Sequence, residues 1–111
     1  MRSVKQLRDG AALERQRSDG YRQQAQHHRD KAGTLPQDAD PNLGLQETNA
    51  AQKLEEKAAE HDRQALKFEQ EATDLEAKAL QVEREQQQLQ VSSQQRLDKL
   101  EQQKNALRGD V

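Results

Sequence analysis

The stretch that decides the fold is residues 51–79, AQKLEEKAAEHDRQALKFEQEATDLEAKA. Alanine recurs in it at every seventh position, from Ala51 to Ala79. Three residues after each alanine comes a residue of a second row, which is larger in every case: Leu54, His61, Phe68, Leu75 and Val82. A sustained seven-residue repeat of this kind predicts an α-helix that packs along a coiled-coil seam.

Residues 2–32 carry the same repeat, which predicts a first helix able to share that seam. Small residues again lie seven positions apart, at Ala11, Ser18, Ala25 and Ala32. Between the two helical stretches lie residues 33–45, which contain both prolines of the chain and predict a loop. Gly10 and Gly20 are weak helix formers, so the first helix could bend at either position.

We therefore predict an all-α protein, an antiparallel two-helix coiled-coil hairpin with a long, projecting second helix at residues 46–107. Residues 46–82 would pair with the first helix, and the Gln-rich residues 83–107 would project or oligomerise. The alternative is a three-helix arrangement with a break near Ser92-Ser93. There Ser-Ser-Gln-Gln fits the spacing of a capping box, and the interval from Leu89 to Leu100 is eleven residues instead of seven.

Charge supports pairing between the two helices. Residues 1–35 hold eight Lys/Arg and four Asp/Glu, a net charge of +4, whereas residues 47–82 hold five and nine, a net charge of −4. Opposite charges along the edges of a seam favour this pairing over association of the first helix with its own copy.

The composition excludes most other classes of protein. Only 31% of the 111 residues are hydrophobic and 2% aromatic, which is too little for an ordinary globular core or a sheet fold. No run of more than three apolar residues occurs, so we expect neither a membrane-spanning helix nor a signal peptide. With no cysteine in the chain, we expect a cytoplasmic location.

The function that we expect is non-enzymatic protein binding, as in adaptors, chaperone-like hairpins, secretion-stalk components and scaffolds. No catalytic grouping and no cofactor site is visible, and a two-helix hairpin has no concave interior. The last helical segment carries apolar residues without a partner in the chain, and these are the candidate docking residues: Leu89, Val91, Leu97, Leu100 and Leu107. The partner would be a second copy or another helical protein.

Two other interpretations concern residues of the hairpin. A row of arginines seven residues apart could contact nucleic-acid phosphates, although pairing with acidic residues of the second helix is favoured: Arg8, Arg15, Arg22 and Arg29. His28 and His61 could bind a metal in a metal-responsive regulator. We favour polar seam residues over metal ligands, because the predicted antiparallel pairing places His28 level with Ala51 or Ala58, and His61 level with Ser18 or Ala25, so the two histidines are not opposite each other.

Overall fold

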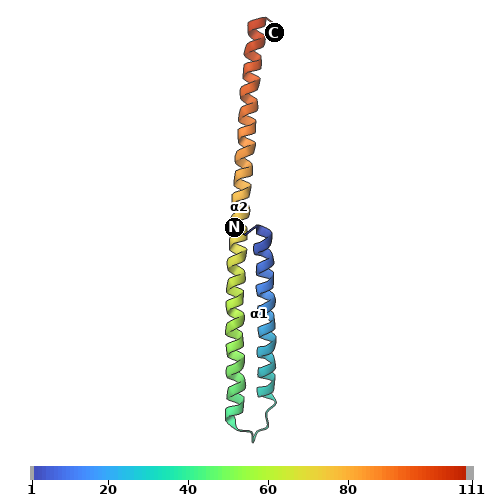
Figure 1. Ribbon diagram of the computed structural model, residues 1–111, viewed down its shortest axis with the longest axis vertical. Coiled ribbons are helices and arrows are strands. Elements are labelled where there is room, and N and C mark those ends of the chain that lie inside the picture. The colour runs from blue at the N-terminus through green and yellow to red at the C-terminus, as the bar shows by residue number, and fades with distance from the viewer. Residues whose placement is uncertain (1, 110–111) are drawn as a thin grey trace. The chain divides into compact units, whose positions relative to one another are not determined.

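The computed structural model describes residues 2–109, and their secondary structure consists of two α-helices, α1 (Val4–Gly33) and α2 (Pro41–Arg108). No strand occurs among these residues. The chain divides into an N-terminal unit, Met1–Asp74, and a C-terminal unit, Leu75–Val111. In the N-terminal unit α1 lies antiparallel to the first part of α2, as Figure 1 shows, which confirms the helical hairpin and the all-α class.

Local side-chain chemistry sets the start and the end of α1. The Ser3 hydroxyl accepts a hydrogen bond from the Gln6 N–H, and the Gln6 side chain accepts one from the Ser3 N–H, at 3.1 and 2.9 Å. This capping box satisfies two backbone donors that the first turn would otherwise leave free. At the other end, the Thr34 N–H donates to the carbonyls of Asp30 and Lys31.

The loop between the helices comprises residues 34–40, fewer than the 33–45 that we expected. The second helix begins at Pro41 and not at residue 46, because Asp40 caps it: the carboxylate of Asp40 accepts from the Asn42 N–H at 3.0 Å. Proline suits the first helical position, since its missing N–H would have no partner there. Gly44, in the first turn, does not delay the start of the helix.

The helices of the hairpin meet along a narrow row of small side chains, which we call the small-residue seam. Its members are at most 2% exposed: Ala11, Ser18 and Ala25 on α1, and Ala51, Ala58, Ala65 and Ala72 on α2. The Ser18 hydroxyl, buried in the seam, accepts a hydrogen bond from Arg22 at 2.6 Å. Leu7 is the one large apolar residue among the described residues that is fully buried.

Gly10 and Gly20, in the interior of α1, lie in continuous helix, and they differ in their surroundings. A Cβ built on Gly10 would come within 3.3 Å of two ring carbons of Phe68, whereas nothing lies within 4 Å of a Cβ on Gly20. Gly10 therefore makes room for the Phe68 ring, while Gly20 has no such packing role.

The alternative with a third helix is wrong, since α2 is helical from Pro41 to Arg108 and passes through Ser92-Ser93 without a break. Within the supposed capping stretch, the Gln94 side chain instead donates a hydrogen bond to Asp98 one turn later, at 3.0 Å. The eleven-residue interval is compatible with this continuity, because eleven residues make about three whole helical turns.

Replacing Gly20 with Ala should stabilise the hairpin by about 0.5–1 kcal/mol, because Ala is the better residue in a helix interior and the added methyl group meets open space. Gly10→Ala should give a smaller gain, because its methyl group crowds the Phe68 ring. Urea unfolding followed by circular dichroism measures both changes. Equal gains in the two variants would contradict the packing role of Gly10.

Ala58→Leu should destabilise the hairpin by about 1–3 kcal/mol, because Ala58 is 0% exposed in the seam and a larger side chain would push the helices apart. The matched control is Ala12→Leu, at an exposed position of α1, which should change stability by less than about 0.5 kcal/mol. Thermal and urea unfolding measure both. A seam that tolerates leucine at residue 58 would refute the close packing described above.

Candidate functional site

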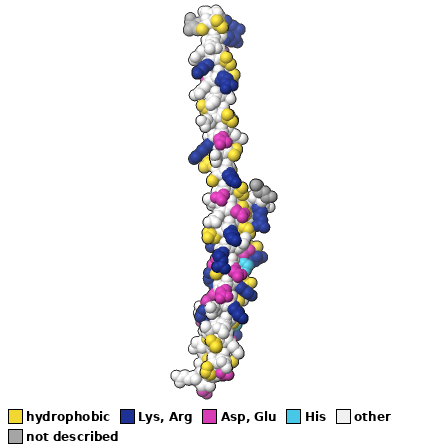
Figure 2. Space-filling model, turned by 90° about the vertical axis from the view of Figure 1, so that its left-hand side faces the viewer, with side chains coloured by type: hydrophobic (Ala, Val, Ile, Leu, Met, Phe, Trp, Pro, Cys, Tyr) yellow, Lys and Arg dark blue, Asp and Glu magenta, His cyan; other side chains and the backbone are white. Residues whose placement is uncertain are grey.

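Four large apolar side chains follow one line along the C-terminal unit, and we call them the apolar stripe: Val82, Leu89, Leu100 and Leu107. At 3.6 residues per turn they lie within about 20° of one another around the helix. Each is more than half exposed, from 53% at Val82 to 90% at Leu107. Hydrophobic side chains recur along this part of the chain in Figure 2.

The direction of the stripe follows from its spacing of seven, eleven and seven residues. The interval from Val82 to Leu107 amounts to about seven whole turns of α-helix, so the stripe runs nearly parallel to the helix axis. A strict seven-residue repeat would instead drift by about 20° with each heptad. A straight partner helix could therefore follow the whole stripe with little supercoiling.

The docking residues that we expected do not all lie on the apolar stripe. Leu89, Leu100 and Leu107 share the stripe, and Leu97, 59% exposed, lies beside it, about 60–80° around the helix. Val91 lies on the opposite side, about 160° or more from Leu89, so it cannot contact the same partner helix. Its exposure of 56% falls within the range of the stripe residues, which makes Val91 a suitable control position.

Val82 is the stripe residue that the sequence analysis assigned elsewhere. We expected it to belong to the segment paired with the first helix, yet 53% of Val82 is exposed. Its interval of seven residues to Leu89 is the signal that could have placed it in the stripe. From Glu76 to Gly109 every residue is exposed except Asn105, so this surface is open throughout the C-terminal unit.

The arginine row of α1 forms a ladder of ion pairs with α2 along one edge of the seam. Three guanidinium groups bind carboxylates at intervals of seven residues on both helices: Arg15 to Glu69, Arg22 to Asp62 and Arg29 to Glu55, with closest contacts of 2.8, 2.5 and 2.8 Å. Arg15 and Arg29 each donate two hydrogen bonds to their partners. This is the pairing with acidic residues that we favoured over contacts with nucleic-acid phosphates.

The ion pairs shift the acidity of the carboxyl groups. The hydrogen bond from Arg22 holds the pKa of Asp62 below its usual value, and Arg29 and Arg15 lower the pKa of Glu55 and Glu69 in the same way. Burial opposes each shift, but its effect is smaller than that of the arginine hydrogen bond. The ladder thus selects the partner and register, while exposed pairs of this kind contribute little energy.

The two seam histidines each bond to a glutamate and lie at different levels of the hairpin. His28 Nδ1 lies 2.5 Å from Glu47 Oε2, and this bond lowers the pKa of Glu47. His61 Nδ1 bonds to Glu14. Glu47 and His61 are about 21 Å apart along α2, at 1.5 Å per residue, so the structure does not bring His28 and His61 together.

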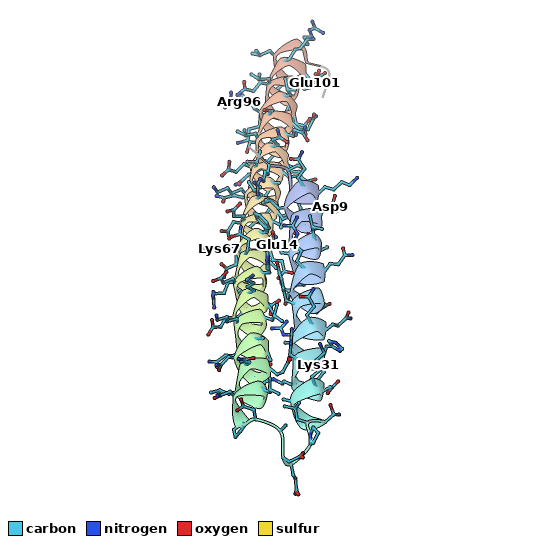
Figure 3. All side chains as sticks on the ribbon, turned by 60° about the horizontal axis from the view of Figure 1, so that its bottom comes forward. Asp9, Glu14, Lys31, Lys67, Arg96 and Glu101 are labelled. Atoms are coloured by element: carbon cyan, nitrogen blue, oxygen red, sulfur yellow. The ribbon has the colours of Figure 1, made fainter. Side chains whose placement is uncertain are left out.

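Glu14 is a contact residue that the sequence analysis missed. It lies between α1 and α2 in Figure 3, whereas Asp9 lies on the outer side of α1. Glu14 lies seven positions before Tyr21, in the row of larger residues beside the small-residue row of α1. This spacing is the signal that could have predicted its contact with α2. Tyr21 in turn stacks on His61, with ring centroids 5.4 Å apart. Glu14, Tyr21 and His61 therefore form one half-buried polar cluster in the hairpin.

Among residues 2–109, no group of three or more His, Cys, Asp or Glu side chains is arranged to hold a metal ion. Over the same residues, no helix combines the length and the apolarity that a membrane span needs. Comparison of the chain with family models, with curated proteins and with solved structures found no match in any of the three.

The ladder predicts that the hairpin loses stability in acid. A carboxyl group whose pKa is lower in the folded than in the unfolded chain stabilises the fold above its unfolded pKa, and this contribution is lost as the pH falls through the folded pKa. The melting temperature should therefore decrease once the pH falls below about 4, the ordinary range of carboxyl groups. Circular dichroism melts at a series of pH values measure this.

The double variant Glu55→Gln and Glu69→Gln should lose less stability over that pH range, because amides do not titrate. Glu60→Gln, an exposed glutamate outside the ladder, serves as the control and should keep the wild-type profile. Identical acid profiles for wild type and the double variant would show that the ladder does not cause the acid sensitivity.

Proposed function

We propose that this protein is a non-enzymatic helical module that binds a protein helix through the apolar stripe of its C-terminal unit. The observation that supports the proposal is the alignment of Val82, Leu89, Leu100 and Leu107 on one face with more than half of each side chain in solvent. Large apolar residues gathered on one face typically mark binding surfaces, because their exposure to water is unfavourable.

Helix stability supports the same proposal. Most of the stability of helices in proteins comes from packing of an apolar face, and intrinsic propensity contributes less. From Glu76 onward the side chains of α2 are exposed apart from Asn105, so propensity alone would have to maintain this segment. A partner helix along the stripe would supply the missing packing.

The size of the stripe suits a reversible contact. Full burial of a Leu or Val side chain contributes about 1.5–3 kcal/mol, so four such residues could contribute about 6–12 kcal/mol. Association itself costs about 4–15 kcal/mol. Because the two ranges overlap, the stripe needs a partner that also buries apolar surface, and a second apolar helix face meets that need.

The double variant Leu89→Glu and Leu100→Glu should weaken protein binding at least tenfold, because it places two charges in the centre of the contact. The matched control is Val91→Glu, which adds a charge at a similarly exposed position on the opposite side and should leave binding within about threefold of wild type. Light scattering reports the mass of the purified chain, and mass spectrometry identifies proteins retained on the immobilised chain.

The proposal would be overturned if neither the mass of the chain nor any retained protein depended on Leu89 and Leu100. Circular dichroism of the variants shows whether the hairpin stays folded. Both residues lie outside the N-terminal unit, so its melting transition should be unchanged.

A further inference from the structure

We propose that the partner of the apolar stripe is a second copy of this chain, bound antiparallel, with Val82 opposite Leu107 of the second copy and Leu89 opposite Leu100. This inference rests on the proposed function and adds the identity and direction of the partner helix. Three features of the chain support it: the symmetry of the stripe, the charges beside it, and the geometry of the hairpin.

The spacing of the stripe is the same in both directions. Intervals of seven, eleven and seven residues are symmetric about a point between Gln94 and Gln95. When two copies run in opposite directions around that point, each stripe residue meets a stripe residue of the other copy. A different partner protein would not require this symmetry, and neither would a parallel pair, in which each residue simply meets its own copy.

The charges along the segment favour the antiparallel direction. Residues 82–94 contain two glutamates and one arginine, a net charge of −1, whereas residues 95–108 contain four Lys/Arg and two Asp/Glu, a net charge of +2. An antiparallel pair places the acidic half of each copy beside the basic half of the other. A parallel pair would place like charges side by side, which is unfavourable.

The hairpin shows how side chains meet in an antiparallel pair of these helices. Tyr21 and His61 stack across it, and the residues that directly follow them, Arg22 and Asp62, form an ion pair. In the proposed dimer, Val82 and Leu107 of the second copy take the place of the stacked pair Tyr21 and His61. The residues that follow these two are Glu83 and Arg108, which have opposite charges.

The centre of the proposed dimer is accounted for by the same geometry. Leu97 lies at the edge of the stripe and would come close to Ser93 of the second copy, one residue from the position opposite it, residue 92, so a large side chain meets a small one near the twofold axis. This arrangement buries Leu97 as well. It also gives a packing role to the small Ser93, which lies within the eleven-residue interval between Leu89 and Leu100. Arg96 and Glu101, labelled in Figure 3, extend from different sides of this segment.

The decisive experiment mixes two variants of the full chain, Leu89→Glu and Leu100→Lys. Each variant alone should dimerise at least tenfold more weakly than wild type, because each homodimer places two unpaired charges against leucine. In an antiparallel heterodimer, the glutamate introduced at position 89 of one copy faces the lysine introduced at position 100 of the other. At the other contact, Leu100 of the Leu89→Glu chain faces Leu89 of the Leu100→Lys chain, so this leucine pair is intact. The mixture should therefore recover dimerisation, measured by sedimentation equilibrium over a range of concentrations.

A parallel dimer gives the opposite result, since residue 89 would face residue 89 and residue 100 would face residue 100. The mixture would then be as weak as the separate variants, and the antiparallel proposal would be wrong. Val91→Glu, on the opposite side of the helix, should dimerise like wild type, and it controls for a general effect of added charge.

Distances between spin labels test the direction independently. The chain has no cysteine, so Gln94→Cys and Gln87→Cys each provide a single labelling position, on nearly the same side of the helix. In the antiparallel dimer the two labels at residue 94 lie at almost the same level, whereas those at residue 87 are offset by about 20 Å along the axis. A parallel dimer would give similar distances at both positions.

The outcomes separate this inference from the proposed function. If the wild-type chain stays monomeric at all concentrations yet retains another protein through Leu89 and Leu100, the self-pairing inference is wrong and the proposed function stands. If no association of any kind depends on these residues, both are wrong.

Discussion

The close approach of two helices over a row of alanines is the constraint on which the hairpin depends. Because residues such as Ala58 and Ala65 carry only a methyl group, the backbones can come near each other, and side chains at the edges reach across. The Arg29–Glu55 pair, joined by two hydrogen bonds at 2.8 Å, is one result. A leucine-lined seam would hold the helices further apart and disturb the ladder.

The same narrow seam explains why the second row tolerates polar residues. When only small side chains occupy the centre, the neighbouring row is half-buried apart from Leu7, and its other members keep contact with water. Glu14 can therefore bond to His61, and His61 can stack on Tyr21, without the cost of burying isolated charges. The hairpin gains register from these contacts, while the apolar contribution to its stability stays small.

The sequence was sufficient to predict the hairpin, because the seven-residue rows and the opposite charges of the two helices both identify the pairing. The sequence alone could not decide whether the second helix breaks at Ser92-Ser93. Ser-Ser-Gln-Gln suits the start of a new helix, and it suits equally well the eleven-residue interval of a continuous helix. Glu14 was missed because an acidic residue in a seam row escapes a search for apolar periodicity. Val91 was grouped with the leucines because all of these residues are apolar and without a partner in the chain, a criterion that does not include their angles around the helix.

The two surfaces of α2 differ in side-chain size, and this difference limits what each can bind. The small-residue seam accepts a helix with small residues opposite, whereas the apolar stripe presents leucines that such a close approach would exclude. A helix suited to the stripe is therefore poorly suited to the seam, and α1 does not offer the leucine row that the stripe needs. Folding of the hairpin and the docking that we propose at the stripe would then not compete, and the stripe would stay available to a second helix after the hairpin has formed.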